Sequence, residues 1–449
     1  MQAQVTPLDG SKAIGITFTD KPVTAFGGVA LFVAFAQRIG LAGKLAETLP
    51  FVLTSPNATP SHHIVLAFLA GVLAGARRFA QLAVLQADVP VQQLFGLRRF
   101  PSTATFTRFF RRFTPKAITE TFEPLWTWHL DRLPAQSQGY TLDLDSSVVE
   151  RYGTQEGALK GYNPKKRGRP SHHPLFAMLA EARCIAHVWL RSGNTASARG
   201  ATAFLAEALA LCAGRVTLAL VRADSGFFDN AILTALEAAE LPYAIVARFT
   251  SLLQAGVYGL TFQPFAPGLE VAELQFQAKR WVRARRIVVV REVLAVRPDA
   301  RGRVLLQVPG YRFHAVVTTL TLAPEEVWRI YNGRADSENR IKELKHAFGA
   351  DGFCSQRFSA TEAVLRFLCL LHNLIGEFQR HLGQRPIRTL ATLRTTLFAC
   401  GAILGAAGRQ PMLRLSRARP WQATFLAHLS RLLPKDANCN AVPVTEAKI

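Results

Sequence analysis

The spacing of apolar residues changes along the chain, and each change marks a different kind of structure. Over residues 1–135, apolar positions recur at helical intervals in several runs interrupted by prolines, with no alternating segment. We therefore predict an α-helical region there. Residues 136–249 begin with YTLDLDSSVV, which alternates like a strand, and two further strand-like runs follow it. Helix, strand, helix and strand then succeed one another. This order predicts an α/β sheet whose first strands are antiparallel.

The pattern changes again after residue 249. Residues 250–311 contain short β-like runs separated by Gly and Pro, without a helical period, and we interpret them as an all-β insertion. Residues 312–380 return to the sheet domain with one strand and then a helix that begins at Pro324. Residues 381–449 are predicted to form a basic helical C-terminal region. No acidic residue occurs between Glu377 and Asp436.

The charge of the chain indicates its class of partner. Its 449 residues include 53 Lys and Arg against 31 Asp and Glu, a net charge of +22. Such a surplus in a chain that is about half hydrophobic indicates a polyanion, with nucleic acid first and an anionic membrane second. The longest uncharged apolar stretch, 64–76, is shorter than the ~18 residues of a spanning helix, so we expect no membrane partner. The start of the chain does not resemble a signal peptide, and the cysteines form no C-x-x-C pair. We expect a cytoplasmic, nucleoid-associated protein with reduced thiols.

One predicted helix in the first region is rich in arginine. In FPSTATFTRFFRRF, Ser102 or Thr103 can cap a helix whose Phe side chains form the apolar stripe. Arg108, Arg111 and Arg112 then face outward. This face either contacts DNA, as the second helix of a helix-turn-helix does, or is simply a solvated basic surface.

Acidic residues occur where open α/β sheets build their sites. Asp145 ends the alternating part of LDLDSS, and Asp143 lies two residues earlier on the same strand face. Asp224 follows the apolar strand VTLALV, in the motif VRADSGFF. Unpaired carboxylates in an apolar setting are costly, so these acids need cations. Mg²⁺ binds carboxylates, phosphate oxygens and water, and two such ions can promote phosphodiester chemistry. The residues alone leave open which of Asp143 and Asp145 is the ligand.

A third acid, Glu338, lies on a helix with an unusual polar stripe. At about 100° per residue, five polar side chains fall within about 80° of one another: Tyr331, Arg334, Glu338, Lys342 and Lys345. An apolar face centred about 90° away contains Ile341, Leu344 and Phe348. We expect the apolar face to pack on the sheet and the stripe to face a cleft. There Glu338 can bind metal while the basic residues meet phosphates.

The spacing Y-x2-R-x3-E-x6-K in this stripe, together with LDLDSS, ADSGFF and KGYNPKKRGRPSHHPL, resembles the bacterial insertion-sequence DDE transposases. The resemblance covers about residues 100–380. It implies a ribonuclease-H-like fold with a two-metal site, for which we expect Mg²⁺ with Mn²⁺ as a substitute. The metal ligands and catalytic residues are then Asp145, Asp224 and Glu338. Small hydroxyl residues usually follow the first acid of the family, which favours Asp145 over Asp143. The resemblance also implies contacts between DNA phosphates and Tyr331, Arg334 and Lys345.

Other DNA contacts are predicted on weaker patterns. Lys165, Lys166 and Arg167 lie in a basic loop rich in Gly and Pro, which either follows a DNA backbone or is solvated. Trp281 is flanked by basic residues and either stacks on an extruded base or belongs to a half-buried strand.

These observations predict a DNA transposase that binds element ends, cleaves them and joins the 3′-OH to target DNA. Its partners are the terminal inverted repeats and the target DNA, and we expect a homodimer in the active complex. The alternatives are a catalytically silent DNA-binding regulator and a nuclease or resolvase of the same fold.

Overall fold

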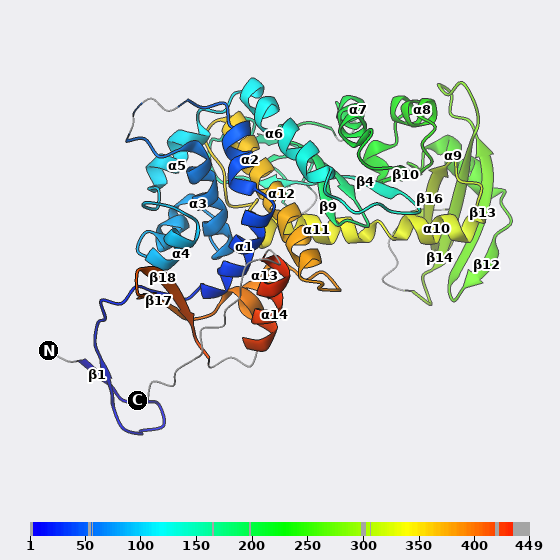
Figure 1. Ribbon diagram of the computed structural model, residues 1–449. Helices are drawn as coiled ribbons and strands as arrows, with labels where there is room; N and C mark the ends of the chain where they lie inside the picture. The colour runs from blue at the N-terminus through cyan, green and yellow to red at the C-terminus, as the bar shows by residue number, and fades with distance from the viewer. Residues whose placement is uncertain are drawn as a thin grey trace.

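The computed structural model describes residues 3–52, 55, 57–163, 166–196, 199–297, 302–305, 307–417 and 422–433. It is a mixed α/β structure in which helices lie on both faces of a large mixed sheet (Figure 1). The N-terminal helices lie at one end of the molecule, and a β-rich extension of the sheet lies at the other (Figure 1).

The predicted N-terminal helices are present, and their caps follow from local sequence. The Ser102 hydroxyl accepts a hydrogen bond from Thr105 N–H at 3.2 Å at the start of the arginine-rich helix. The helices are α1 (Ala30–Arg38), α2 (Leu41–Thr48), α3 (Ser61–Leu73), α4 (Val89–Leu94), α5 (Thr103–Phe110) and α6 (Pro115–Leu130), with short 3₁₀ turns η1 (Gly27–Val29) and η2 (Phe79–Leu85).

The prediction of a wholly helical region 1–135 is wrong for its first residues. Strands β1 (Ala3–Val5) and β2 (Ile14–Ile16) form an antiparallel pair, and β3 (Val23–Thr24) follows. The β-branched residues of these segments favour an extended backbone.

The sheet itself has the predicted order. Strand β4 (Tyr140–Ser146) pairs antiparallel with β8 (Leu175–Leu179), which pairs antiparallel with β9 (Cys184–Trp189). On its other edge β4 is parallel to β10 (Leu218–Ala223), and β10 is parallel to β11 (Tyr243–Val246). The crossover helices are α7 (Ala201–Cys212) and α8 (Asn230–Ala238). Short strands β5 (Val149–Glu150), β6 (Leu159–Lys160) and β7 (Pro170–His172) form a small sheet beside it.

The insertion differs from the all-β prediction in two ways. It begins with a helix, α9 (Ser251–Tyr258), because Thr250 caps it and Leu253 and Val257 bury one side. Its strands also continue the main sheet, because β16 (Val308–Thr318) pairs antiparallel with β11. The predicted boundary after residue 311 therefore falls inside β16. The remaining strands are β12 (Gln263–Ala266), β13 (Leu269–Phe276), β14 (Arg285–Val293) and β15 (Arg303–Leu305).

The C-terminal region is not wholly helical either. Strands β17 (Ala402–Ala407) and β18 (Gln410–Leu415) form a hairpin, and β17 also pairs with β3. A tight turn at Gly408, whose φ is +61°, allows this hairpin. The two ends of the described chain therefore share one three-stranded sheet. The other elements are α13 (Leu390–Leu393), the π-helical turn η4 (Arg394–Phe398) and α14 (Gln422–Leu432).

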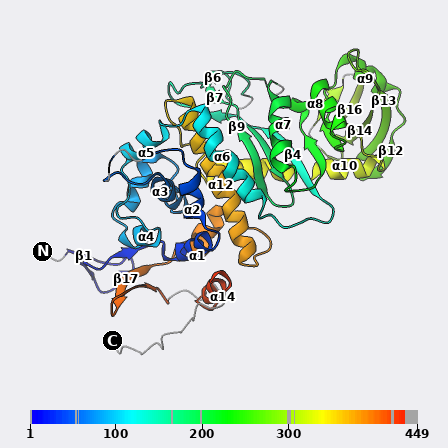
Figure 2. The same ribbon diagram turned by 45° about the horizontal axis from the view of Figure 1, so that its top comes forward.

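Helix α12 (Phe358–His381) forms the centre of the core. It lies between the N-terminal helices and the sheet in both views (Figures 1 and 2). By length and composition it is long and apolar enough to cross a membrane, but 83% of that apolar window is buried inside the protein. Such burial is also typical of the core helix of a globular domain. Before α12 lie α10 (Pro324–Asn332) and α11 (Ala335–His346), which run beside the sheet toward its β-rich end (Figure 1).

Candidate active site

The pairing of β4 with β10 brings two of the predicted acids together. In the register of these parallel strands, Asp143 lies beside Arg222 and Leu144 lies beside Ala223. The next residue on each strand is an acid, so Asp145 and Asp224 lie side by side at the same edge of the sheet. Asp145 Oδ1 accepts a hydrogen bond from Ser146 N–H at 2.8 Å. Asp224 Oδ1 accepts one from Gly226 N–H at 2.9 Å and caps a short 3₁₀ turn, η3 (Ser225–Phe227). Both carboxylates therefore stand at the carboxyl ends of neighbouring parallel strands.

Asp143 has a different environment from Asp145. Both of its oxygens bind Arg222, at 2.7 and 2.9 Å, and Oδ2 also accepts a hydrogen bond from the Ser337 hydroxyl at 2.8 Å. Asp143 is 1% exposed. A carboxylate that is buried and fully paired in this way has a structural role, so the geometry favours Asp145 as the candidate ligand.

The predicted helix of the polar stripe is in fact two helices. Helix α10 ends at Asn332 and α11 begins at Ala335, with Gly333 and Arg334 between them, although the two form nearly one rod (Figure 1). Arg222 Nη1 donates to the carbonyl of Ile330 at 2.7 Å and so satisfies the end of α10. A Cβ on Gly333 would lie 2.6 Å from the same Nη1 atom. The close approach of Arg222 thus requires glycine there.

Arg334 joins the helix to the strand ends. Its guanidinium lies 3.3 Å from Asp145 Oδ1 and 3.8 Å from Glu338 Oε1. Arg334 is 5% exposed, whereas the Glu338 side chain is 60% exposed. The expected apolar face of α11 is confirmed, because Ile341, Leu344 and Phe348 are buried in the core.

The electrostatics of the site show an excess of negative charge. The pKa of Asp145 is raised to about 6, chiefly by burial and also by the charges of Asp224 and Glu338, against the opposing charge of Arg334. Burial also raises the pKa of Tyr331 to about 12, and the same three carboxylates contribute in that direction. Three acids therefore influence one another, and Arg334 is the buried cation that lies between Asp145 and Glu338.

The donor set fits a divalent cation, although the carboxylates are not drawn together around one point. Within the described ranges, no group of three or more His, Cys, Asp or Glu side chains is arranged to hold a metal ion. Glu338 is exposed and its ion pair with Arg334 is long, so it is free to turn toward the strand ends. Burial and two neighbouring carboxylates make ionised Asp145 costly, and a hard cation with oxygen ligands would offset that cost.

The two lysines of the stripe differ in environment. Lys345 Nζ donates to the Ser147 hydroxyl at 2.5 Å and to the Val148 carbonyl at 2.7 Å, so it supports the turn that follows Asp145. Lys342 is exposed. The ring of Tyr331 stacks on Trp328, with a centroid distance of 6.1 Å.

Other residues also adjoin the site. His173 is 4% exposed, and burial lowers its pKa while the charges of Asp224 and Lys345 act on it. Arg248 donates to the Ser225 carbonyl at 2.8 Å and so supports the turn after Asp224. The role of Arg222 could not be predicted from the sequence. Its partner, Asp143, lies on a neighbouring strand, and the pairing of the two strands is known only from the structure.

Of the predicted basic contacts of the N-terminal helix, Arg108 lies on α5, and Arg111 and Arg112 directly follow its last residue. Arg108 and Arg111 are exposed. Arg112 is also exposed, but its guanidinium lies 4.4 Å from the centroid of the Phe51 ring and donates to the Val52 carbonyl at 3.3 Å. Part of its donor capacity is thus used within the protein.

The basic loop is partly described. Lys165 lies outside the described residues. Lys166 Nζ forms a 2.9 Å ion pair with Glu150, and Arg167 is exposed. The loop therefore presents Arg167 outward, while the charge of Lys166 is partly offset by a neighbouring acid.

Neither the stacking role predicted for Trp281 nor the alternative of a half-buried strand residue fits its position, because Trp281 is buried in the turn between β13 and β14. Trp281 is 8% exposed, and its ring contacts those of Phe228 and Phe276, each at a centroid distance of 5.7 Å. The Arg285 guanidinium lies 4.5 Å from its centroid. With aromatic rings and a cation around it, Trp281 belongs to the core of the sheet extension.

Carboxylates at adjacent strand ends in a strongly basic chain are features of a protein that processes nucleic acid. A family model described as the transposase DDE domain, group 1, matches residues 6–436. The chain therefore belongs to the DDE transposase family, as its motifs indicated, and is a DNA transposase by family, with DNA as its partner. Enzymes of this family generally use divalent metals.

Comparison with solved structures finds several matching chains. One of them is the piggyBac transposase in a synaptic complex with hairpin DNA. The match covers 96% of this chain and 90% of the piggyBac chain, with 10% sequence identity and a TM-score of 0.46. A comparison with curated protein sequences finds no significant match.

Proposed function

We propose that this DNA transposase cleaves phosphodiester bonds at the ends of its element and joins the freed 3′-OH ends to target DNA. The observation that carries the proposal is the placement of Asp145 and Asp224 at adjacent parallel strand ends, with Arg334 between Asp145 and Glu338. We also propose that strands β9, β8, β4, β10 and β11 form a ribonuclease-H-like core, since three antiparallel strands are followed by two parallel ones.

In this proposal Asp145, Asp224 and Glu338 hold two Mg²⁺ ions, for which Mn²⁺ can substitute. When bound, such ions activate a water molecule and stabilise the leaving oxygen of a phosphodiester. Asp145 must lose its proton before it can serve as a ligand, and a pKa of about 6 leaves it mostly ionised at neutral pH. Glu338 turns from the surface toward the strand ends, and Arg334 releases Asp145 while remaining close enough to meet a phosphate.

The stripe then supplies the contacts around the reacting phosphate. Lys345 keeps the turn after Asp145 in place through Ser147 and Val148. Lys342 and Arg334 attract the DNA backbone, and the buried hydroxyl of Tyr331 stays protonated and can donate a hydrogen bond, because its pKa is about 12. On the opposite part of the protein, Arg108 and Arg111 of α5 neutralise phosphates of the element end. We further propose a homodimer in the active complex and a location on the nucleoid.

Cleavage of DNA that carries the sequences flanking the reading frame tests the proposal. Wild-type protein is expected to cut it with Mg²⁺ and to stop when EDTA is added, whereas a silent regulator would bind without cutting. Joining of a pre-cut end to a second DNA separates a transposase from a nuclease.

A pair of matched variants locates the chemistry. Asp224 and Asp229 both cap a helical turn by accepting a 2.9 Å hydrogen bond from the N–H two residues later. Asp224→Asn and Asp229→Asn therefore make the same chemical change in similar local settings. We expect Asp224→Asn to abolish cleavage while keeping DNA binding, and Asp229→Asn to keep both. Equal activity of the two variants would remove Asp224 from the site.

A further inference from the structure

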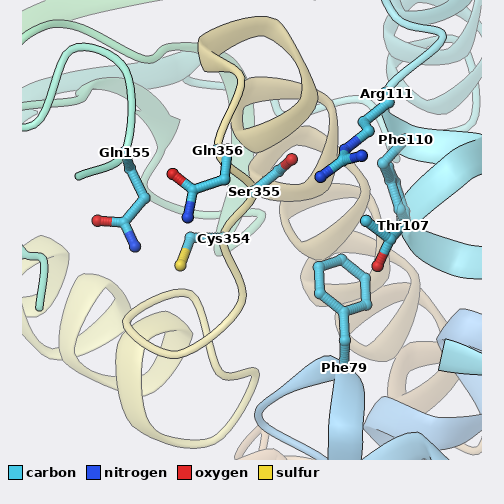
Figure 3. Close-up of a pocket in the computed structure, with 8 residues that line it drawn as sticks. All are labelled: Phe79, Thr107, Phe110, Arg111, Gln155, Cys354, Ser355 and Gln356. Atoms are coloured by element: carbon cyan, nitrogen blue, oxygen red, sulfur yellow. The ribbon is translucent and has the colours of Figure 1, made fainter. Parts of the chain in front are cut away.

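The DNA contacts proposed for the N-terminal helix neutralise phosphates and carry no sequence information. Arg111, for example, lines a cavity of about 150 Å³ between α5 and the segment before α12, and its side chain extends toward Ser355 (Figure 3). A guanidinium turned toward its own protein can meet a phosphate at the surface, but it does not project into a groove. Base sequence is read through base edges in the grooves, so selective binding of element ends calls for a further element.

The hairpin β17–β18 is a ribbon at the edge of the molecule (Figures 1 and 2). Ala407 and Gln410 are its last paired residues, so Gly408 and Arg409 form a two-residue loop at its apex. Gly408 has a φ of +61°, which suits the first position of such a tight turn. Strand β3 pairs with the first two residues of β17, at the opposite end of the ribbon. Near the apex the ribbon is therefore two strands wide.

The two faces of the ribbon differ, because side chains alternate along each strand. Leu413 and Leu415 line an apolar cavity of about 400 Å³ together with Leu429 of α14, so this face is turned toward the helices. Gln410 and Arg414 alternate with these leucines, and both are exposed. Arg409 at the apex is exposed as well. The ribbon thus packs on the protein with an apolar face and presents polar side chains to solvent.

The base of the ribbon is fixed to the N-terminal region. Gly27 N–H donates to the Cys400 carbonyl at 2.8 Å, and Leu404 N–H donates to the Pro22 carbonyl at 2.9 Å. A Cβ on Gly27 would lie 2.6 Å from the Cβ of Ala402, so this close packing requires glycine. A fixed base holds the exposed apex in one position before any partner binds.

The charge and shape of the ribbon select duplex DNA as its partner. No acidic residue occurs between Glu377 and Asp436, and in the described part of the chain neither Arg409 nor Arg414 has an acidic partner. A two-stranded ribbon fits the major groove, which is about 12 Å wide, but not the minor groove. The free edge of β18 contains Pro411, which has no N–H, and a charged residue. Both features protect an edge strand from pairing with a second copy of the chain.

We propose that the β17–β18 ribbon enters the major groove of element-end DNA, where Arg409 and Gln410 contact base edges and Arg414 contacts a phosphate. Arginine binds guanine through O6 and N7, and glutamine binds adenine through N6 and N7. The Arg414 guanidinium lies along the ribbon, since a Cβ on Gly405 would be 3.7 Å from its Nη1. This inference rests on the proposed function, in which the protein binds the ends of its element.

Fluorescence anisotropy of the full chain with labelled DNA tests the proposal. One probe is an end duplex taken from the sequence that flanks the reading frame, and the other is a scrambled duplex of the same length and base composition. Wild-type protein is expected to prefer the end duplex. Arg409→Ala and Gln410→Ala should each reduce this preference about tenfold, because each removes a base contact. Arg414→Ala is the matched control on the same ribbon. It should weaken binding to both duplexes alike and flatten the salt slope by about 0.9.

A base analogue locates the contact in the major groove. 7-Deazaguanine lacks the N7 acceptor but keeps the minor-groove edge of guanine. Replacing the guanines of the end duplex one at a time should identify a position at which wild-type affinity falls about fivefold or more. Arg409→Ala should lose nothing further at that position. All three substituted residues are exposed, so the melting temperature should stay unchanged in each variant.

The outcomes separate this inference from the proposed function. An unchanged preference in Arg409→Ala and Gln410→Ala would overturn the role of the ribbon. If wild-type protein still prefers the end duplex and cuts it with Mg²⁺, the proposed function stands. Binding to vesicles of phosphatidylserine and phosphatidylcholine that is lost in Arg409→Ala and Arg414→Ala, with DNA binding intact, would assign the ribbon to an anionic membrane instead. A wild-type protein that neither prefers nor cuts the end duplex would overturn both.

Discussion

Arg222 and Asp143 face each other across the parallel strands β10 and β4 and form two hydrogen bonds of 2.7 and 2.9 Å, two residues before Asp224 and Asp145. The same guanidinium binds the last turn of α10, and Ser337 of α11 binds the same carboxylate. One buried ion pair thus ties both strand ends to the helices that carry Arg334 and Glu338. We infer that it aligns the candidate catalytic groups without taking part in the chemistry.

The two aspartates of β4 should therefore respond to substitution in opposite ways. Asp143→Asn leaves the buried Arg222 charge without its partner and should reduce the free energy of unfolding by about 3–5 kcal/mol. Asp145→Asn removes a buried carboxylate with a raised pKa and should increase stability while abolishing cleavage. Urea unfolding and a cleavage assay on both variants test this. A stable but inactive Asp143→Asn variant would instead place Asp143 in the chemistry.

The stability of the metal-free protein should depend on pH through Asp145. Its pKa is about 6 in the folded state and about 3.9 in the unfolded chain. Between these values the folded state binds more protons, so stability should fall as pH rises from 4 through 6 and then level off. The loss should be on the order of 3 kcal/mol for this group. Unfolding of wild type and Asp145→Asn across this range measures it, since the variant should lack the difference. Mg²⁺ should also remove the pH dependence of the wild-type stability, because a bound cation favours the ionised carboxylate.

Two glutamates of α11 provide a matched comparison on one helix. Glu338→Gln should abolish cleavage, because an amide is a poor ligand for Mg²⁺, and should leave stability nearly unchanged at this exposed position. Glu343 accepts a hydrogen bond from Leu390 N–H at 2.7 Å, and a glutamine oxygen can accept the same bond. Glu343→Gln should therefore keep both the fold and the activity. Loss of cleavage in both variants across a Mg²⁺ titration would mean that the wrong face of α11 has been assigned.

The arginines of α5 should differ in their contribution to DNA binding. Replacing Arg108 and Arg111 together should flatten the slope of log affinity against log salt by about two, at about 0.9 per phosphate contact. Arg112 is partly engaged by Phe51 and Val52, so Arg112→Ala should change the slope less and lower stability more. Fluorescence anisotropy of labelled DNA over a range of salt concentrations measures the slopes. An unchanged slope in the double variant would make this face a solvated surface.

Much of the architecture follows from local pattern. The order of strands and helices, the cap at Ser102 and the apolar face of α11 each depend on residues a few positions apart, whose geometry is set by the repeat of a helix or strand. The motif spacing around Glu338 also indicated the family, because it encodes one face of a helix. The sequence alone therefore determined the class of protein, and it predicted Asp224, Glu338 and one of two aspartates of β4 as the candidate catalytic acids.

The remaining features depend on which distant segments meet, and a local pattern carries no information about that. The pairing of β3 with β17, the continuation of the sheet through β16, and the burial of Trp281 all depend on contacts far apart in the chain. The same holds for Asp143 and Asp145, which look alike in sequence. Only the tertiary structure gave Asp143 two hydrogen bonds from Arg222 and buried Asp145 beside two further carboxylates, because an electrostatic environment is the sum over neighbours from every element.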